Sequence, residues 1–162
     1  MQTTYTKEQQ NKLLKGIYDI CLREEDREQF EACNRQQFDD LIEITRRAAE
    51  IIGKPLRPDP DTIDSRDYQA GYAGKWRYGV SGTVEGCDLA IWKPHSGLDE
   101  LQIEPYDDGY RLIYCGFCDK PLFMATANRC QTIFAIAYFM QTEELTPSLE
   151  WKTLWKGEQN GA

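Results

Sequence analysis

The sequence has few of the residues that build all-β cores and membrane spans. It contains only two valines, and this scarcity disfavours an all-β protein, because β-branched residues are enriched in strands. The longest apolar run, Ile133–Met140, has eight residues, whereas a membrane-spanning helix needs about 20. Residues 1–10 are polar and lack the apolar stretch of a signal peptide. We therefore expect a cytoplasmic protein.

Positive charge is also scarce. The 19 lysines and arginines are outnumbered by 27 aspartates and glutamates, which gives a formal net charge of −8 and a pI near 4.7. This charge opposes direct binding to nucleic acids and to anionic membranes, whose phosphates repel it. A partner protein with a basic surface remains compatible with it.

The 162 residues suffice for one domain that buries a core without disulfides or metals. The hydrophobic periodicity changes from helical to alternating and back, which predicts an α+β fold. We expect two N-terminal helices, a four- to five-stranded antiparallel sheet, a buried helix and a short C-terminal helix. The predicted parts are a helical part at 6–53, an extended connection at 54–67, a sheet with helices at 68–157 and a loose tail at 158–162.

The two N-terminal helices are predicted from their ends and their apolar stripes. Thr6 and Gln9 have the spacing of a capping box, in which each side chain accepts a hydrogen bond from the backbone N–H of the other. One apolar stripe at helical spacing covers residues 13–22, and a second covers residues 30–52. Gly53 ends the second helix.

Alternating apolar and polar residues predict the sheet. Leu101 and Ile103, for example, alternate with polar neighbours. Asp108 and Gly109 form a strong hairpin signal between two strands.

Two helices are predicted after the sheet. Asn128 and Gln131 have capping-box spacing, and Ile133–Met140 is apolar on every side. We therefore expect this helix to lie between the sheet and the N-terminal helices. Thr146, followed by a proline, predicts a short amphipathic helix that ends at Gly157.

Acidic residues are unopposed along one predicted strand and hairpin. The segment 94–110 contains five acidic residues and no lysine or arginine. Alternate side chains on a strand lie roughly 6.6 Å apart, so a row of carboxylates could meet a row of basic side chains on a partner. The alternative is charge that only keeps the protein soluble. The candidate partner-binding residues are Asp99, Glu100, Glu104, Asp107 and Asp108.

Aromatic residues alternate with glycines at the start of the sheet region. Large rings on loops contribute contact area at low entropic cost, which is typical of recognition surfaces. The alternative is packing at the edge of the core. The candidate residues are Tyr68, Tyr72, Trp76 and Tyr78.

Cys115 and Cys118 have the spacing of half a zinc site. Tetrahedral closure needs two more ligands, for which Cys87, Cys130 and His95 are available. No second Cys-x-x-C pair exists in the sequence, so free thiols are the alternative. A redox role is disfavoured, because a strand rather than a helix is predicted after the pair.

Enzyme chemistry has little support in the sequence. A cysteine hydrolase needs a histidine as its base, and His95 is the only histidine. No signature around any cysteine supports this role, and no carboxylate pair stands out.

No motif is specific enough to name a family. Our leading hypothesis is a small acidic cytoplasmic protein that binds a basic protein surface, such as that of a nucleic-acid-binding protein, through an acidic face and aromatic loops. It would act as an inhibitor or adaptor without a cofactor. A phage- or plasmid-type antagonist of host defence, such as an anti-CRISPR protein acting in the host cytoplasm, is one example. A zinc-stabilised interaction module is the alternative, and a small cysteine- or carboxylate-dependent enzyme is the second alternative.

Overall fold

The computed structural model describes residues 6–12, 35–61, 68–83, 86–116 and 120–154. Several predictions fall outside these residues: the apolar stripe at 13–22, the zinc candidate Cys118, the end of the C-terminal helix beyond residue 154 and the tail at 158–162.

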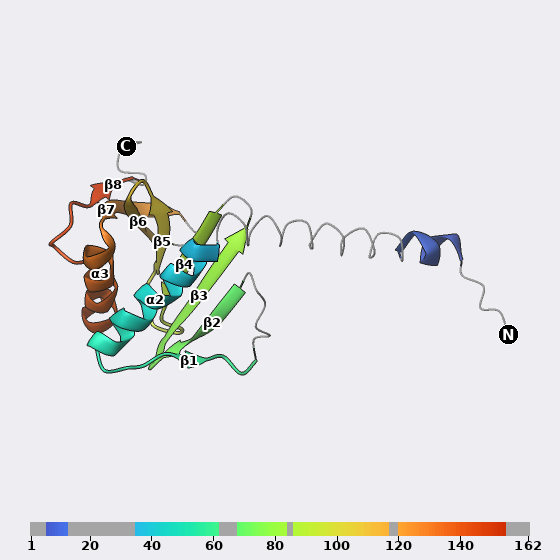
Figure 1. Cartoon of the computed structure of the whole chain (residues 1–162), viewed down its shortest axis with the longest axis horizontal. Helices are drawn as coiled ribbons and strands as arrows, with labels where there is room; N and C mark the ends of the chain where they lie inside the picture. Colours follow the sequence, from blue (N-terminus) through green and yellow to red (C-terminus); the bar gives the residue numbers. More distant parts are fainter. Residues whose placement is uncertain (1–5, 13–34, 62–67, 84–85, 117–119, 155–162) are drawn as a thin grey trace.

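Helix α2 is followed by seven consecutive strands, helix α3 and a last strand (Figure 1). Residues 7–12 are also helical. The bounds are α2 (Arg35–Ile51), β1 (Arg57–Pro58), β2 (Tyr68–Ala73), β3 (Trp76–Thr83), β4 (Gly86–Trp92), β5 (Glu100–Tyr106), β6 (Gly109–Cys115), β7 (Pro121–Ala127), α3 (Arg129–Thr142) and β8 (Lys152–Thr153).

The strands form one antiparallel meander. All eight lie in a single sheet in the order of the sequence, and each strand pairs with the next. A meander needs only short connections, because an antiparallel neighbour can follow a tight turn.

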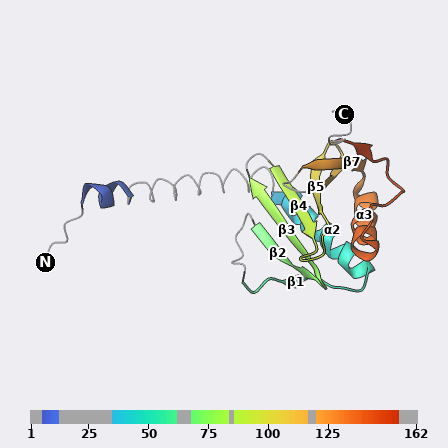
Figure 2. The same ribbon diagram turned by 180° about the vertical axis from the view of Figure 1, so that it is seen from behind.

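Helices α2 and α3 cover one face of this sheet. They contact each other, α2 contacts β3 and β4, and α3 contacts β6 and β7. Figures 1 and 2 view the chain from opposite sides, and both show the helix pair against the sheet. Every second side chain of the central strands points toward the helices and joins a common core with them. The opposite face is free of helices in the part of the chain that the structure describes.

Three predicted helix ends are confirmed. Gln9 N–H donates to Thr6 Oγ1 at 3.1 Å, and Thr6 N–H donates to Gln9 Oε1 at 2.9 Å. Asn128 and Gln131 form the same reciprocal box at the start of α3. Gly53, at a φ of 70°, ends α2 in the left-handed conformation that glycine adopts without strain.

The prediction that α3 is packed on all sides is correct only for the side that faces α2 and the sheet. Ile136 and Phe139 are fully or almost fully buried against α2 and the sheet. Phe134, however, is 51% exposed on the outer side of the helix. An apolar residue on every side of a helix therefore does not imply a neighbour on every side.

The turn of the hairpin between β5 and β6 lies one residue earlier than predicted. Tyr106 pairs with Gly109, so the two turn residues are Asp107 and Asp108 rather than Asp108 and Gly109. Asp107 supplies the positive φ, at 50°. Gly109 is required for another reason: a Cβ atom there would lie 2.4 Å from the carbonyl oxygen of Ala127 on β7.

The predicted C-terminal helix is wrong within the described residues. The chain turns at Thr146, whose carbonyl oxygen accepts a hydrogen bond from the Trp151 indole N–H at 2.8 Å. It then runs along β7 as β8, and Leu154 N–H donates to Leu122 O at 2.9 Å. Leu149 of this segment belongs to the core, and Trp151 packs against it.

The predicted α+β class is correct, but the predicted sheet of four to five strands is wrong, because the sheet has eight. The predicted pair of N-terminal helices does not fit either, because α2 packs on the sheet whereas the helical residues 7–12 are all exposed. The additional strands are β1, in the proline-rich connection, β2, which was expected to be a loop, and β8. β1 and β8 have two residues each, too few to show an alternating pattern. No helix among the described residues is long and apolar enough to cross a membrane.

Candidate binding surface

The helix-free side of the sheet presents a continuous polar and aromatic surface, which we call the open sheet face. Its side chains alternate with the core residues along each strand, so the cross-strand register assigns them. The larger side chains of this face are Tyr68, Tyr72, Arg77, Asp88, Trp92, Glu100, Gln102, Glu104, Tyr106, Arg111, Ile113, Met124 and Lys152.

One end of the open sheet face is built around Arg77. Tyr72, Arg77 and Trp92 lie directly opposite one another on β2, β3 and β4. The Arg77 Cζ atom lies 4.8 Å from the Tyr72 ring centroid and 5.7 Å from that of Trp92, which is cation–π distance. The Arg77 guanidinium also donates to Asp59 Oδ2 at 2.6 Å.

Asp59 holds this arginine from a buried position. Its residue exposure is 6%, and its Oδ1 accepts a hydrogen bond from the Asp61 N–H at 2.9 Å. The Arg77 Nε atom is buried without a hydrogen-bond partner among the described residues. The guanidinium is therefore fixed by one carboxylate and two rings.

The other end of the open sheet face repeats this arrangement around Arg111. Arg111 on β6 lies directly opposite Glu104 on β5, and its Nε donates to Glu104 Oε1 at 2.6 Å. The Arg111 Cζ atom lies 4.8 Å from the centroid of the Tyr106 ring. The prediction that the acidic residues of segment 94–110 are unopposed is thus wrong for Glu104. The pairing of β5 with β6 places Arg111, which lies outside that segment, opposite it.

The remaining predicted acidic residues spread along the hairpin. Glu100 lies on the open sheet face and accepts a hydrogen bond from Gln102 Nε2 at 2.8 Å. Asp107 and Asp108 are exposed in the turn, and Asp99 precedes β5 at its opposite end. A seven-residue strand is about 23 Å long, so these carboxylates do not form one cluster.

Asp88 adds a carboxylate that sequence reasoning did not single out. It lies opposite Ser81, and burial raises the pKa of its carboxyl, with the negative charge of Glu104 acting in the same direction. The hydrogen bond from Ser81 opposes this rise in pKa. Two carboxylates from β4 and β5 thus repel one another across the open sheet face.

The four predicted aromatic residues divide between the two faces. Tyr68 and Tyr72 lie on the open sheet face, on strand β2 rather than on a loop. Trp76 and Tyr78 belong to the core, with exposures of 2% and 9%, and Trp76 packs against Phe139 of α3. They are therefore not available to a partner on the open sheet face.

The described cysteines do not assemble a metal site. Cys87 and Cys115 are buried, whereas Cys130 is exposed at the start of α3. No group of three or more potential metal ligands occurs among the described residues, which do not include Cys118. Burial raises the pKa of the Cys87 thiol to about 11, and this disfavours the thiolate that binds zinc.

His95 is exposed in the connection between β4 and β5, at a φ of 61°. None of its hydrogen bonds in the described part of the chain reaches a cysteine, so the geometry of a cysteine–histidine pair is not present there.

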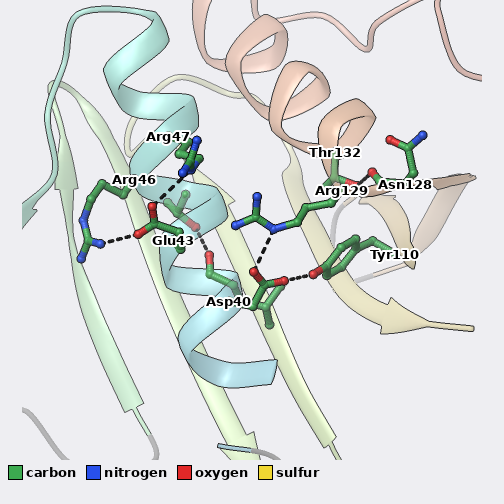
Figure 3. Close-up of polar contacts among 10 residues, drawn as sticks. Asp40, Glu43, Arg46, Arg47, Tyr110, Asn128, Arg129 and Thr132 are labelled. Atoms are coloured by element: carbon green, nitrogen blue, oxygen red, sulfur yellow. Dashed lines mark hydrogen bonds and ion pairs between the residues drawn. The ribbon is translucent and has the colours of Figure 1, made fainter. Parts of the chain in front are cut away.

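A partly buried polar network joins the two helices to the sheet (Figure 3). Asp40 of α2 accepts a hydrogen bond from Arg129 Nε of α3 at 2.9 Å and a second from the Tyr110 hydroxyl of β6. Burial and Asp40 raise the pKa of the Tyr110 phenol, so it stays a hydrogen-bond donor. The network thus holds α2, α3 and β6 together (Figure 3).

Comparisons with protein-family models, with curated proteins and with solved structures identify no match to this chain.

Proposed function

We propose that this chain is a cytoplasmic protein-binding protein, an inhibitor or adaptor, that contacts a basic partner protein through its open sheet face. The observation that supports this proposal is the pair of arginines, Arg77 and Arg111, each fixed on that face by a carboxylate and at least one aromatic ring.

The composition of the face suits a protein partner. Tyrosine, tryptophan, arginine and methionine are enriched at protein–protein contacts, and the first three dominate their binding energy. Tyr68 and Tyr106 are 37% and 43% exposed, so their rings can be buried further by a partner.

The face is also prearranged. A free arginine loses much rotamer freedom when it is immobilised on binding, about 0.5–1.5 kcal/mol for such a side chain. Arg77 is already held by Asp59, Tyr72 and Trp92 in the unbound chain. Much of this entropic cost is therefore met during folding.

The charge of the face favours a basic partner. Arg77 and Arg111 are each neutralised by a carboxylate. Asp88 and Glu100 have no ion pair among the described residues, and they outnumber Lys152, the further cation of the face. The whole chain carries a net charge of −8. A basic partner would be attracted over a distance and oriented by this charge.

Affinity capture followed by crosslinking tests the proposal. The immobilised full chain is exposed to an extract of its native host, and each captured protein is purified and crosslinked to the chain. We expect a partner with a basic surface whose crosslinks fall on residues flanking β3 to β6. Crosslinks confined to the helix side of the molecule would refute the proposal.

A further inference from the structure

The helix side of the molecule exposes an apolar patch that the proposed function does not use. Ile51 at the end of α2 is 62% exposed, and Phe134 on α3 is 51% exposed. Cys130 is also exposed, one helical turn before Phe134. The apolar residues of α3 are distributed around the whole helix. Some of them therefore face water on the side that does not pack against α2 or the sheet.

A hollow lies between the helices, and two of its lining residues, Cys130 and Ile133, are helical neighbours of Phe134. A cavity of about 430 Å³ opens between the helices, lined by Ile51, Cys130 and Ile133 together with Arg47 and Glu50. Phe134 directly follows Ile133 on α3 and stands one turn beyond Cys130. The patch thus presents a projecting ring beside a hollow with apolar walls.

The rim of the hollow carries both signs of charge. Arg47 and Glu50 are exposed on the same side of α2. Arg47 Nε donates to Glu43 at 3.2 Å, in an exposed pair that leaves its other nitrogens available. Glu50 has no ion pair among the described residues.

We propose that this patch binds a second copy of the same chain, with two-fold symmetry. In a two-fold contact one surface meets itself, so each projection needs a hollow on the same patch and each charge needs its opposite. The ring of Phe134 enters the hollow of the other copy, and Arg47 of each copy faces Glu50 of the other. A contact with an unrelated basic protein would use the hollow and Glu50 but not Arg47.

The exposed apolar side chains also favour association through this patch. Exposed large apolar side chains grouped beside a hollow mark association sites on water-soluble surfaces. If the proposed function holds, the dimer would present two open sheet faces, because the helix pair and the open sheet face lie on opposite sides of the sheet (Figures 1 and 2).

Sedimentation velocity of the full chain tests this proposal without any knowledge of the partner. We expect the mass to rise from 18.8 kDa toward twice that value as the concentration increases from low to several hundred micromolar. Phe134→Glu should stay monomeric at every concentration. Leu154→Glu is the matched control, because Leu154 is 45% exposed near β8, and it should dimerise as the unchanged chain does.

A charge-exchange experiment tests the symmetry of the contact. Arg47→Glu and Glu50→Arg should each weaken the homodimer, because each variant places two like charges together. A mixture of the two variants should restore dimers, since residue 47 of one copy then meets an opposite charge at residue 50 of the other. Exposed Glu150→Lys and Lys152→Glu serve as the control mixture, for which native mass spectrometry should show no enrichment of mixed dimers.

Three results would overturn the proposal. The first is an unchanged chain that remains monomeric throughout, and the second is a Phe134→Glu variant that dimerises normally with native circular dichroism. The third is a monomer in which Phe134 is protected from hydroxyl-radical labelling. Such protection would mean that another segment of the same chain covers the patch. Each result leaves the proposed function of the open sheet face standing.

Discussion

Glu104 of β5 lies directly opposite Arg111 of β6, and the Arg111 Nε donates to the Glu104 carboxylate at 2.6 Å. This pairing changes which carboxylates of the open sheet face can attract a partner. The charge of Glu104 is neutralised, whereas Glu100 and Asp88 have no ion pair among the described residues. The electrostatic predictions therefore concern these two residues.

Glu100→Lys should weaken the affinity for the basic partner and flatten its dependence on salt, because the new positive charge on the open sheet face repels the partner. The matched control is Glu144→Lys, which changes the net charge equally at an exposed position outside the sheet. Titrations at low and high ionic strength measure both effects. Equal losses in the two variants would show that total charge, not the open sheet face, attracts the partner.

Asp59→Asn should lower the free energy of unfolding by about 1–2 kcal/mol, because the buried carboxylate loses its charge opposite Arg77. Glu43→Gln is the comparison, since Glu43 pairs with Arg46 and Arg47 on the exposed side of α2 and such pairs contribute about 0–1 kcal/mol. Urea unfolding of both variants measures the difference. An Asp59 variant as stable as the Glu43 variant would count against a rigid Arg77.

Tyr110→Phe should destabilise the fold by about 1 kcal/mol at neutral pH, because Asp40 loses one of its two donors. The pKa of Tyr110 is raised by burial, so the stability it contributes is fully present below the usual phenol value of 10.0 and is lost as the pH rises through the higher value in the folded chain. The stability gap between Tyr110→Phe and the unchanged chain should be constant from pH 7 to about pH 10. A gap that closes between pH 7 and 9 would contradict the raised pKa.

Asp88 is an exposed residue whose carboxyl is partly desolvated by its neighbours. Asp88→Asn should stabilise the fold slightly at pH 7, since this partial desolvation and Glu104 raise the pKa of the carboxyl above its usual value of 3.8. A raised pKa means that the folded chain favours the protonated form, so this carboxyl contributes stability at low pH and loses it as the pH rises. The advantage of Asp88→Asn should therefore shrink as the pH falls toward 3.8. Chemical unfolding at several pH values measures the difference in free energy of unfolding between the variant and the unchanged chain. A difference that grows on acidification would contradict the prediction.

Local sequence signals predicted local structure well. The capping boxes at Thr6 and Asn128 and the stop at Gly53 depend on neighbouring residues alone, and all three are present in the structure. Strands β1 and β8 depend on pairing with distant segments, and each is too short to carry a pattern of its own. The turn at Thr146 resembled a helix start because Thr-Pro favours both.

The open sheet face was only partly predictable, for the same reason. Alternation with Leu101 and Ile103 placed Glu100 and Glu104 outside the core correctly. Nothing in the sequence set Arg111 opposite Glu104, because that contact depends on a two-residue turn one position earlier than expected. Trp92 could have been assigned to the same face, since it follows the core residue Ile91 in the strand.

The central claim is that the open sheet face binds the partner, and a calorimetric titration of the captured partner against Trp92→Ala tests it most directly. Trp92 lies beside Arg77 on this face, whereas Leu154→Ala truncates an apolar side chain exposed near β8. We predict that Trp92→Ala weakens the affinity about tenfold or more while Leu154→Ala leaves it unchanged. A folded Trp92→Ala variant that binds the partner as tightly as the unchanged chain would contradict the account.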